Sequence, residues 1–351
     1  MLEPMPALTA SAPGKILLSG EYAVLRGAPA LACAVDRSVR VSVRTAAGAI
    51  GTLRATPLAR GRFEFDPSLQ AFWLDPDQAE KRLGLTSRLL PDLYTALLSK
   101  ADPLLDIEID SAELFEPIGD RRIKLGLGSS AAVAVALNRA LLRWSGQSQP
   151  RPKVELQALL PRYRRCLGSE ASGADLATSV YGGLNVIQSD AGAIEVQPMR
   201  WPEGLHWRVI WTGAAAQTTD YVQRFLNWMD HSQAADDCMY ALLRTAQDVI
   251  TACQYGSSTD LCGALNQYFQ QLMRMDRSMI ALDSSPARIL TSSHRQLAQR
   301  AQQQGVAYKT LGAGGGDLGL AYGLDYEALA QFCDGLSAGG PSPLELRMTL
   351  P

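Results

Sequence analysis

The stretch KLGLGSSAA, from Lys124 to Ala132, decides how this 351-residue chain is interpreted. A segment with strand-like alternation precedes it and an alanine-rich segment with helical spacing follows, so it predicts a glycine-rich turn that leads into a helix. Glycines let the backbone approach a ligand closely, and the free N–H groups of a first helical turn bind phosphate oxygens. The alternative is an ordinary turn with a serine as helix N-cap. The pattern is neither G-x-x-x-x-G-K-[ST] nor G-x-G-x-x-G, which excludes a Walker-type loop.

Strands and helices are predicted on both sides of this stretch. Apolar side chains recur at alternate positions over residues 35–44 and 105–110, which predicts two half-buried strands. Helical spacing covers residues 130–144, 154–165 and 292–304, and Gly305 is placed to end the last helix. Because strands and helices are mixed without regular β-α alternation, we predict an α+β fold. An interruption at residues 199–204 predicts a domain boundary, which gives domains 1–200 and 201–351.

The composition argues against several classes of function. The formal net charge is −2, so no basic surplus is available to neutralise a nucleic-acid backbone or an anionic membrane surface. The sequence has no run of about 18 apolar residues and no leader-like N-terminus, so we expect a cytoplasmic protein that binds neither membrane nor nucleic acid. The six cysteines are scattered without metal-ligand spacing, which predicts reduced thiols.

Three segments together resemble the motifs of the GHMP kinase superfamily. Lys124 to Ala132 is similar to the second motif, APGKILLSGEYAVL (Ala12 to Leu25) to the first, and LGAGGGD (Leu311 to Asp317) to the third. The motifs stand in the family's order over nearly the whole chain. The resemblance implies a kinase that moves a phosphoryl group from ATP, with Mg²⁺, onto a small anionic acceptor. It also implies the GHMP kinase fold, with an N-terminal ribosomal-protein-S5-like ATP-binding domain and a C-terminal ferredoxin-like α+β domain.

Several details resemble the phosphomevalonate kinases of that superfamily. Tyr22 gives the first motif the form G-E-Y-A-V, where mevalonate kinases tend to have G-E-H-A-V, Lys124 precedes G-L-G-S-S, and Asp317 ends the third motif. The resemblance therefore implies phosphomevalonate as the acceptor. The alternatives are mevalonate or another hydroxyl acceptor and, more remotely, an inactive nucleotide-binding relative.

The resemblance also implies roles for individual residues. Lys15 is predicted to contact the transferred phosphoryl group or the acceptor, and Asp175 to be the catalytic aspartate, with helix N-capping as its rival role. A hydroxyl acceptor needs a general base, whereas a phosphate monoester is already mostly dianionic at neutral pH, so Asp175 would then orient Lys15 or the acceptor. The predicted ATP-binding residues are Lys124, Gly126, Leu127, Gly128, Ser129, Ser130 and Ala131. The predicted acceptor-binding residues are Ser19, Glu21, Tyr22, Ser172, Gly173, Ala313, Gly314, Gly315 and Asp317.

The metal ligands are the least specific part of this interpretation. Magnesium is expected to bind Ser130 and Glu170, although Glu170 could equally be an exposed loop acid. The chain departs from mevalonate kinases at Arg164, because the resemblance would place a metal-binding glutamate there. Three further cations are either anion-binding groups or solvated surface charges: Arg121, Arg122 and Lys309. The oligomeric state stays open between monomer and homodimer.

Overall fold

The computed structural model describes residues 7–99, 102–118, 121–168, 172–190, 192–213, 218–282, 288–316, 318–336 and 340–349. The chain forms two compact units, which are described separately. The first unit comprises residues 1–15, 36–122 and 127–182, and the second comprises residues 16–35, 123–126 and 183–351. Strands β1 (Leu8–Ser19) and β2 (Ala30–Thr45) contribute residues to both units. The predicted domains 1–200 and 201–351 are domains of the kinase family rather than compact units of this kind, so the boundary at residue 200 stays a prediction.

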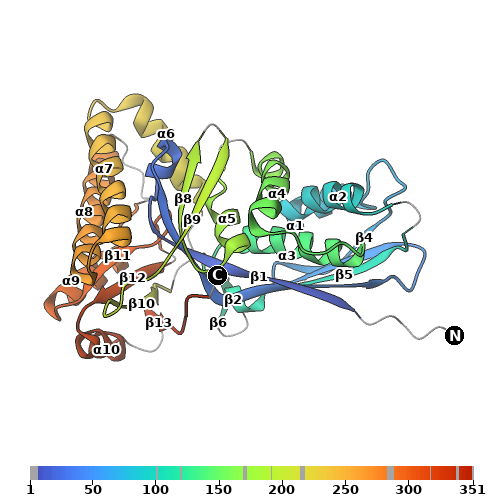
Figure 1. The fold of residues 1–351 in the computed structure, drawn as a ribbon. Coiled ribbons are helices and arrows are strands. Elements are labelled where there is room, and N and C mark those ends of the chain that lie inside the picture. Colours follow the sequence, from blue (N-terminus) through green and yellow to red (C-terminus); the bar gives the residue numbers. More distant parts are fainter. Residues whose placement is uncertain are drawn as a thin grey trace. The chain divides into compact units, whose positions relative to one another are not determined.

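The first unit is a sheet with helices packed on it. Its strands follow the order β4 (Ala59–Phe65), β3 (Gly51–Thr56), β5 (Leu105–Asp110) and β2, with β3 parallel to β5 and the other neighbours antiparallel. The helices are α1 (Pro76–Leu83), α2 (Leu85–Leu97), α3 (Ser129–Trp144), α4 (Pro152–Leu167) and α5 (Ala174–Tyr181). Helices α1 to α4 lie on one side of the strands (Figure 1). Between β5 and α3 the chain forms the short helix η2 (Ala112–Leu114) and the pair β6 (Phe115–Ile118) and β7 (Arg121–Lys124).

The two strands predicted from alternation pair with each other. Val41 lies opposite Ile109 and Val43 opposite Ile107 in the antiparallel register of β2 and β5. All four side chains are buried, so the apolar positions of the alternating pattern are those that face the core. The helices predicted over residues 130–144 and 154–165 are confirmed as α3 and α4.

A buried ion pair fixes the helices of the first unit against one another. Arg139 of α3 donates from Nε to Glu155 Oε1 and from Nη2 to Glu155 Oε2, both at 2.9 Å, and the Glu155 side chain is fully buried. The same guanidinium donates to the Val180 carbonyl of α5 at 2.9 Å. The Ser179 hydroxyl then donates to the Pro13 carbonyl of β1 at 2.9 Å. Helices α3 and α5 are therefore held together next to β1, which carries Lys15.

The second unit contains a four-stranded antiparallel sheet and most of the C-terminal helices. The strand order is β11 (Ala307–Thr310), β12 (Leu318–Gly323), β10 (His206–Trp211) and β13 (Ser342–Leu344). Helices α6 (Thr218–His231), α7 (Ala235–Tyr255), α8 (Ser258–Leu282), α9 (Ser292–Gln303) and α10 (Tyr326–Asp334) belong to this unit, and α7 and α8 run side by side (Figure 1). The unit also holds η1 (Ala23–Arg26) and the hairpin of β8 (Leu184–Asp190) and β9 (Ala193–Met199), in which β8 pairs with the start of β2.

Local sequence explains where α9 begins and ends. The Thr291 side chain accepts a hydrogen bond from the His294 N–H, which caps the N-terminus, and Gly305 adopts a left-handed φ of 73° just after the helix. Leu297 and Ala301 of this helix pack into a core with Ile210, Tyr308 and Phe332. The predicted helix over residues 292–304 and the mixed α+β architecture are both confirmed.

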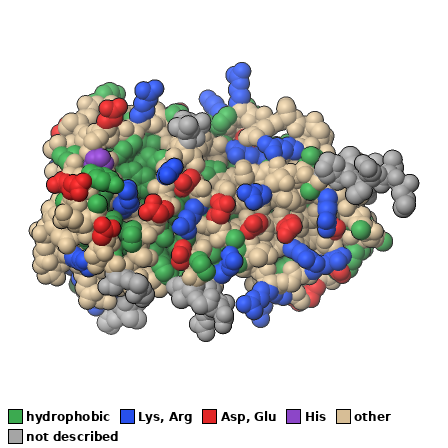
Figure 2. Space-filling view, turned by 90° about the horizontal axis from the view of Figure 1, so that it is seen from below, with side chains coloured by type: hydrophobic (Ala, Val, Ile, Leu, Met, Phe, Trp, Pro, Cys, Tyr) green, Lys and Arg blue, Asp and Glu red, His purple; other side chains and the backbone are tan. Residues whose placement is uncertain are grey.

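The surface matches the balanced composition of the chain. Lys and Arg side chains are interspersed with Asp and Glu side chains over the face shown in Figure 2. Among the residues described, none of the helices combines the length and the apolar character that a membrane-crossing segment needs.

Candidate active site

The predicted phosphate loop leads into α3. Strand β7 ends at Lys124, and α3 begins at Ser129 with Gly128 as its N-cap. Gly126 and Gly128 both adopt a φ of 73°, a left-handed conformation that glycine reaches without steric cost. The start of α3 receives no side-chain cap among the residues described, so the alternative of a serine N-cap is wrong.

The first turn of α3 presents hydrogen-bonding groups that are not used within the helix. Its leading N–H groups have no intrahelical acceptors, as in any α-helix. The Ser129 hydroxyl is buried and has no hydrogen-bond partner within the described parts of the chain. Because buried polar groups are nearly always paired, an orphaned hydroxyl at a helix N-terminus suits an anion whose oxygens accept hydrogen bonds. Ser130, in the same turn, is half-buried.

Lys15 lies directly beside this loop. Its backbone N–H donates to the Leu127 carbonyl at 2.8 Å. Its side chain passes so close to Gly128 that a Cβ there would lie 2.9 Å from Lys15 Cε. Its Nζ lies 2.9 Å from Asp175 Oδ1, and 11% of the Lys15 side chain is exposed, whereas 43% of the Asp175 side chain is exposed. The lysine is therefore confined, while the carboxylate stays open to a ligand.

Asp175 stands at the start of a second helix. Helix α5 begins at Ala174 with Gly173 as its N-cap, and Asp175 sits in the first turn without capping it, so the rival capping role is wrong. A carboxylate in a first turn is still stabilised by the positive end of the helix dipole. The Lys15 ammonium and the N-termini of α3 and α5 thus occur together within the first unit, and all three features favour negative charge.

The residues just before α5 are engaged in local structure. The Ser172 hydroxyl accepts a hydrogen bond from the Ala174 N–H at 3.3 Å, and the Ser172 carbonyl accepts one from Arg164 Nη2 at 3.2 Å. Arg164, which stands where the resemblance places a metal-binding glutamate, therefore supports the backbone at the start of α5. Burial, and secondarily the Asp175 charge, raises the pKa of the Tyr163 phenol well above its usual value. Tyr163 was not predicted, because helical spacing in the sequence does not indicate that its phenol will be close enough to sense the Asp175 charge.

The predicted metal ligands are only partly described. Glu170 lies outside the described residues, and Ser130 sits in the first turn of α3. Within the described ranges, no three His, Cys, Asp or Glu side chains are grouped as a metal site would need. The assignment of Mg²⁺ to Ser130 and Glu170 stays a prediction.

The third glycine motif forms a loop between β11 and β12 in the second unit. Gly314 and Gly315 adopt φ of 76° and 81°. A Cβ on Gly314 would lie 2.6 Å from the Ile289 carbonyl oxygen, and one on Gly315 would fall on the Tyr221 ring. The glycines are therefore required by both conformation and packing, so the motif is more than a hairpin turn. Asp317 lies outside the described residues.

The first motif contributes buried polar groups to the second unit. Glu21 Oε1 accepts a hydrogen bond from Lys309 Nζ at 2.5 Å, and both side chains are almost completely buried. Tyr22 has the unusual φ of 63°, and its hydroxyl donates to the Ala313 carbonyl at 2.5 Å. The Ser19 hydroxyl is buried and has no partner among the described atoms.

Lys309 was expected to be either an anion-binding group or a solvated surface charge, and the second alternative is wrong. Its exposed fraction is 0%, so it is not a solvated surface charge. Burial lowers the pKa of the Lys309 ammonium, and the Glu21 carboxylate acts in the opposite direction. Arg122, by contrast, is exposed, and the side chain of Arg121 lies outside what the structure describes.

The predicted site residues are divided between the two units. The first unit holds Lys15, Leu127, Gly128, Ser129, Ser130, Ala131, Ser172, Gly173 and Asp175, and the second holds Ser19, Glu21, Tyr22, Lys124, Gly126, Ala313, Gly314 and Gly315. Within each unit the structure brings several of them into direct contact. The convergence of both groups on one ligand stays a prediction.

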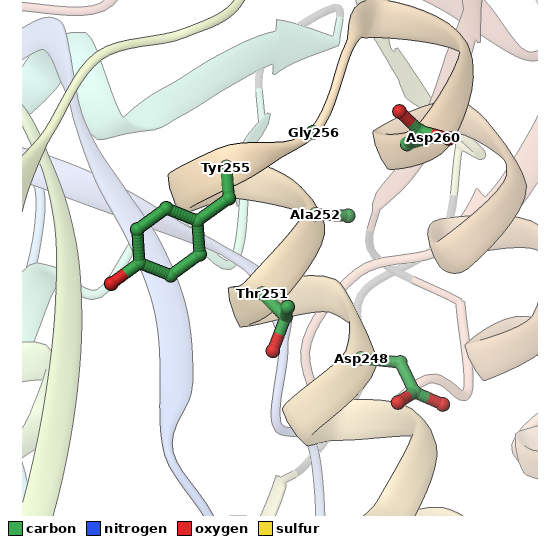
Figure 3. Close-up of a pocket in the computed structure, with 6 residues that line it drawn as sticks. All are labelled: Asp248, Thr251, Ala252, Tyr255, Gly256 and Asp260. Atoms are coloured by element: carbon green, nitrogen blue, oxygen red, sulfur yellow. The ribbon is translucent and has the colours of Figure 1, made fainter.

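A shallow depression in the second unit involves none of these residues. It lies where α7 turns into α8 and is lined by Asp248, Thr251, Ala252, Tyr255, Gly256 and Asp260 (Figure 3). Asp260 already accepts hydrogen bonds from the N–H and hydroxyl of Ser257, both at 2.7 Å, so it serves the local turn. The depression therefore contributes nothing to the candidate active site.

Gly128→Ala should reduce turnover by about 10- to 100-fold, because sub-ångström to 1 Å errors in catalytic geometry have effects of this size. The new Cβ would overlap the Lys15 side chain and would also be held at a positive φ. Steady-state kinetics checks this expectation, with Gly146→Ala as the matched control. Gly146 follows the other end of α3 with the same φ of 73°, but a Cβ there meets nothing within 4 Å. Equal losses of turnover in both variants would contradict the steric explanation.

Comparison with known proteins identifies relatives of this chain. The family description "GHMP kinases N terminal domain" matches residues 93–183. The phosphomevalonate kinase of Streptomyces sp. (strain CL190) is 30% identical over 364 aligned positions, which cover 90% of each protein. The mevalonate kinase of Methanothermobacter thermautotrophicus is 35% identical over 181 positions, which cover 52% of this chain and 50% of that enzyme. The Streptococcus pneumoniae phosphomevalonate kinase in complex with phosphomevalonate and AMPPNP superimposes with a TM-score of 0.73 at 20% identity, covering 96% of this chain and 99% of that one.

The chain belongs to the GHMP kinase family. The expected GHMP kinase fold is confirmed, and the protein is an ATP-dependent phosphotransferase of the branch that includes phosphomevalonate and mevalonate kinases. The short spacing between Lys15, Gly128 and Asp175 fits that chemistry, because phosphoryl transfer depends on positioning and charge neutralisation more than on covalent participation by the protein.

Proposed function

We propose that this protein transfers the γ-phosphoryl group of ATP to phosphomevalonate, giving diphosphomevalonate. The observation that carries the proposal is the Lys15 ammonium, 2.9 Å from Asp175 and packed against Gly128 at the N-terminus of α3. The phosphomevalonate kinase relative matches 90% of the chain, and Tyr22 carries the motif form of that subfamily. Both features support phosphomevalonate over mevalonate as the acceptor.

In this proposal each residue has a separate task. The first turn of α3 would bind phosphate oxygens through its free N–H groups and the Ser129 hydroxyl. Lys15 would neutralise charge on the transferred phosphoryl group, and Asp175 would keep the ammonium in place through the 2.9 Å contact. Because the phosphate of the acceptor is mostly dianionic at neutral pH, Asp175 does not need to remove a proton.

Magnesium is a proposed cofactor. The Ser129 hydroxyl, which has no partner among the described residues, and the neighbouring Ser130 support this proposal, because they place oxygen ligands of the kind Mg²⁺ favours at the start of α3. When bound, the ion would offset negative charge on the nucleotide. Ser130 is the proposed protein ligand, together with Glu170.

A coupled assay that measures ADP release tests the acceptor. Phosphomevalonate and mevalonate are offered separately at equal concentration, with ATP and Mg²⁺ in excess. We expect kcat/KM for phosphomevalonate to exceed that for mevalonate by at least about 100-fold, because a site built for a charged group rejects an analogue that lacks it. A preference for mevalonate would overturn the proposal and would make the open carboxylate of Asp175 a general base.

A further inference from the structure

The third glycine loop has few side chains of its own with which to hold its shape. Residues 312–316 consist of four glycines and Ala313, so the loop must be fixed by groups from outside it. On one side the Tyr22 hydroxyl donates to the Ala313 carbonyl at 2.5 Å. On the other side the Gly315 N–H donates to the Ile289 carbonyl at 3.0 Å. The second contact can position the loop only if Ile289 is itself fixed.

Asp276 fixes Ile289. This residue lies on α8, and its Oδ1 accepts a hydrogen bond from the Ile289 N–H at 2.8 Å. The neighbouring Leu290 N–H also lowers the pKa of the same carboxylate. Asp276 is 3% exposed and Ile289 is 1% exposed, so water does not compete for these hydrogen bonds. The connection therefore runs from α8 through Asp276 and the Ile289 backbone to Gly315, entirely within the second unit.

A buried carboxylate at this position is costly and so requires an explanation. Desolvation of a charged group opposes burial unless hydrogen bonds or opposite charges compensate for it. Burial raises the pKa of Asp276, while the two backbone N–H groups and the nearby Arg224 and Arg288 act in the opposite direction. An apolar residue on this face of α8 would avoid that cost, but it could not accept the hydrogen bond from the Ile289 N–H.

We infer that Asp276 is a positioning residue for the third glycine loop, which it aligns through the Ile289 backbone without touching substrate. The inference rests on the proposed function in one respect, namely that the third glycine loop is expected to lie against the acceptor. Misalignment of the loop should lower kcat or the apparent affinity for the acceptor while the first turn of α3, in the first unit, remains as it is.

Two substitutions and a matched control test the role of Asp276. Asp276→Ala removes the acceptor oxygens, and Asp276→Asn keeps an oxygen that can accept a hydrogen bond while it removes the charge. Asp325→Ala is the control, because Asp325 also accepts hydrogen bonds from backbone N–H groups, those of Glu327 at 2.9 Å and Ala328 at 3.1 Å, but does so at the exposed start of α10. Amide hydrogen exchange is measured at Gly315 together with kinetics on the acceptor that the wild type uses.

The expected result is specific to the loop. Asp276→Ala should lose protection of the Gly315 amide and lower kcat/KM for the acceptor by about 10- to 100-fold, the scale expected for misplaced catalytic groups. Asp276→Asn and Asp325→Ala should retain both the protection of the Gly315 amide and the kcat/KM for the acceptor. Unchanged Gly315 protection in Asp276→Ala, or equal losses in Asp276→Ala and Asp276→Asn, would overturn the inference. The exchange measurement does not depend on the acceptor, so a wild type that prefers mevalonate would refute the proposed function alone.

Discussion

Lys15→Met is expected to lower kcat by about 10²- to 10³-fold, the effect of removing one preorganised group that stabilises transition-state charge. Methionine keeps the length and much of the volume of the lysine side chain, so packing against Gly128 should survive. What disappears is the ammonium that lies 2.9 Å from Asp175 at the N-terminus of α3. Initial-rate kinetics at saturating ATP measures the loss, and ATP-dependent thermal stabilisation shows whether the nucleotide still binds.

Asp175→Asn separates the two proposed roles of the pair. If phosphomevalonate is the acceptor, this variant should lose less activity than Lys15→Met, because charge neutralisation outweighs proton removal. Lys153→Met is the matched control, since Lys153 is exposed on α4 in the same unit. Equal collapse of Lys15→Met and Asp175→Asn to background would contradict this assignment of roles.

Lys309→Met is expected to destabilise the folded protein by about 3–5 kcal/mol, the usual cost of removing one partner of a buried charge pair. The Glu21 and Lys309 side chains are 1% and 0% exposed, and their closest atoms are 2.5 Å apart. Removal of the ammonium leaves the Glu21 carboxylate buried without that donor. Urea unfolding followed by circular dichroism measures the loss as a lower midpoint of the unfolding transition.

A double substitution shows whether this loss comes from the Glu21 charge that remains after Lys309 is replaced. Glu21→Leu combined with Lys309→Met removes both charges, and apolar replacement of a whole buried pair is often close to neutral. The double variant should therefore recover much of the stability that Lys309→Met loses. Lys81→Met, at an exposed position on α1, should leave the unfolding midpoint unchanged. A Lys309→Met protein as stable as the wild type would contradict a structural role for the pair.

Sequence patterns predicted the local elements well, because periodicity reports local burial directly. The alternation at Val41 and Val43 identified the strand that pairs with β5, and helical spacing identified α3, α4 and α9. The helix starts were predicted less well. Serine and aspartate caps were considered at α3 and α5, but glycines in the left-handed conformation occupy both N-cap positions. At α3 the N-cap glycine leaves the first turn without a side-chain cap among the described residues, which suits a ligand better than a cap, whereas at α5 the Ser172 hydroxyl accepts a hydrogen bond from the Ala174 N–H.

The motif resemblance located Lys15 and Asp175, which the fold brings together, but it could not reveal contacts between distant segments. Glu21 and Lys309 are 288 positions apart, and only the folded chain shows that they form a buried pair. Asp276 was missed for the same reason. Its carboxylate accepts a hydrogen bond from the backbone N–H of Ile289, and the Ile289 side chain has no part in that contact. A single sequence carries no signal for a hydrogen bond to the main chain of a separate segment.

Transfer of label from [γ-³²P]ATP tests the central claim most directly. The wild type and Lys15→Met are incubated with labelled ATP, Mg²⁺ and phosphomevalonate, and the products are separated. We predict that the wild type moves the label into diphosphomevalonate, and that Lys15→Met still binds ATP but transfers label far more slowly. Label released only as inorganic phosphate by the wild type, or transfer by Lys15→Met at the wild-type rate, would contradict the account.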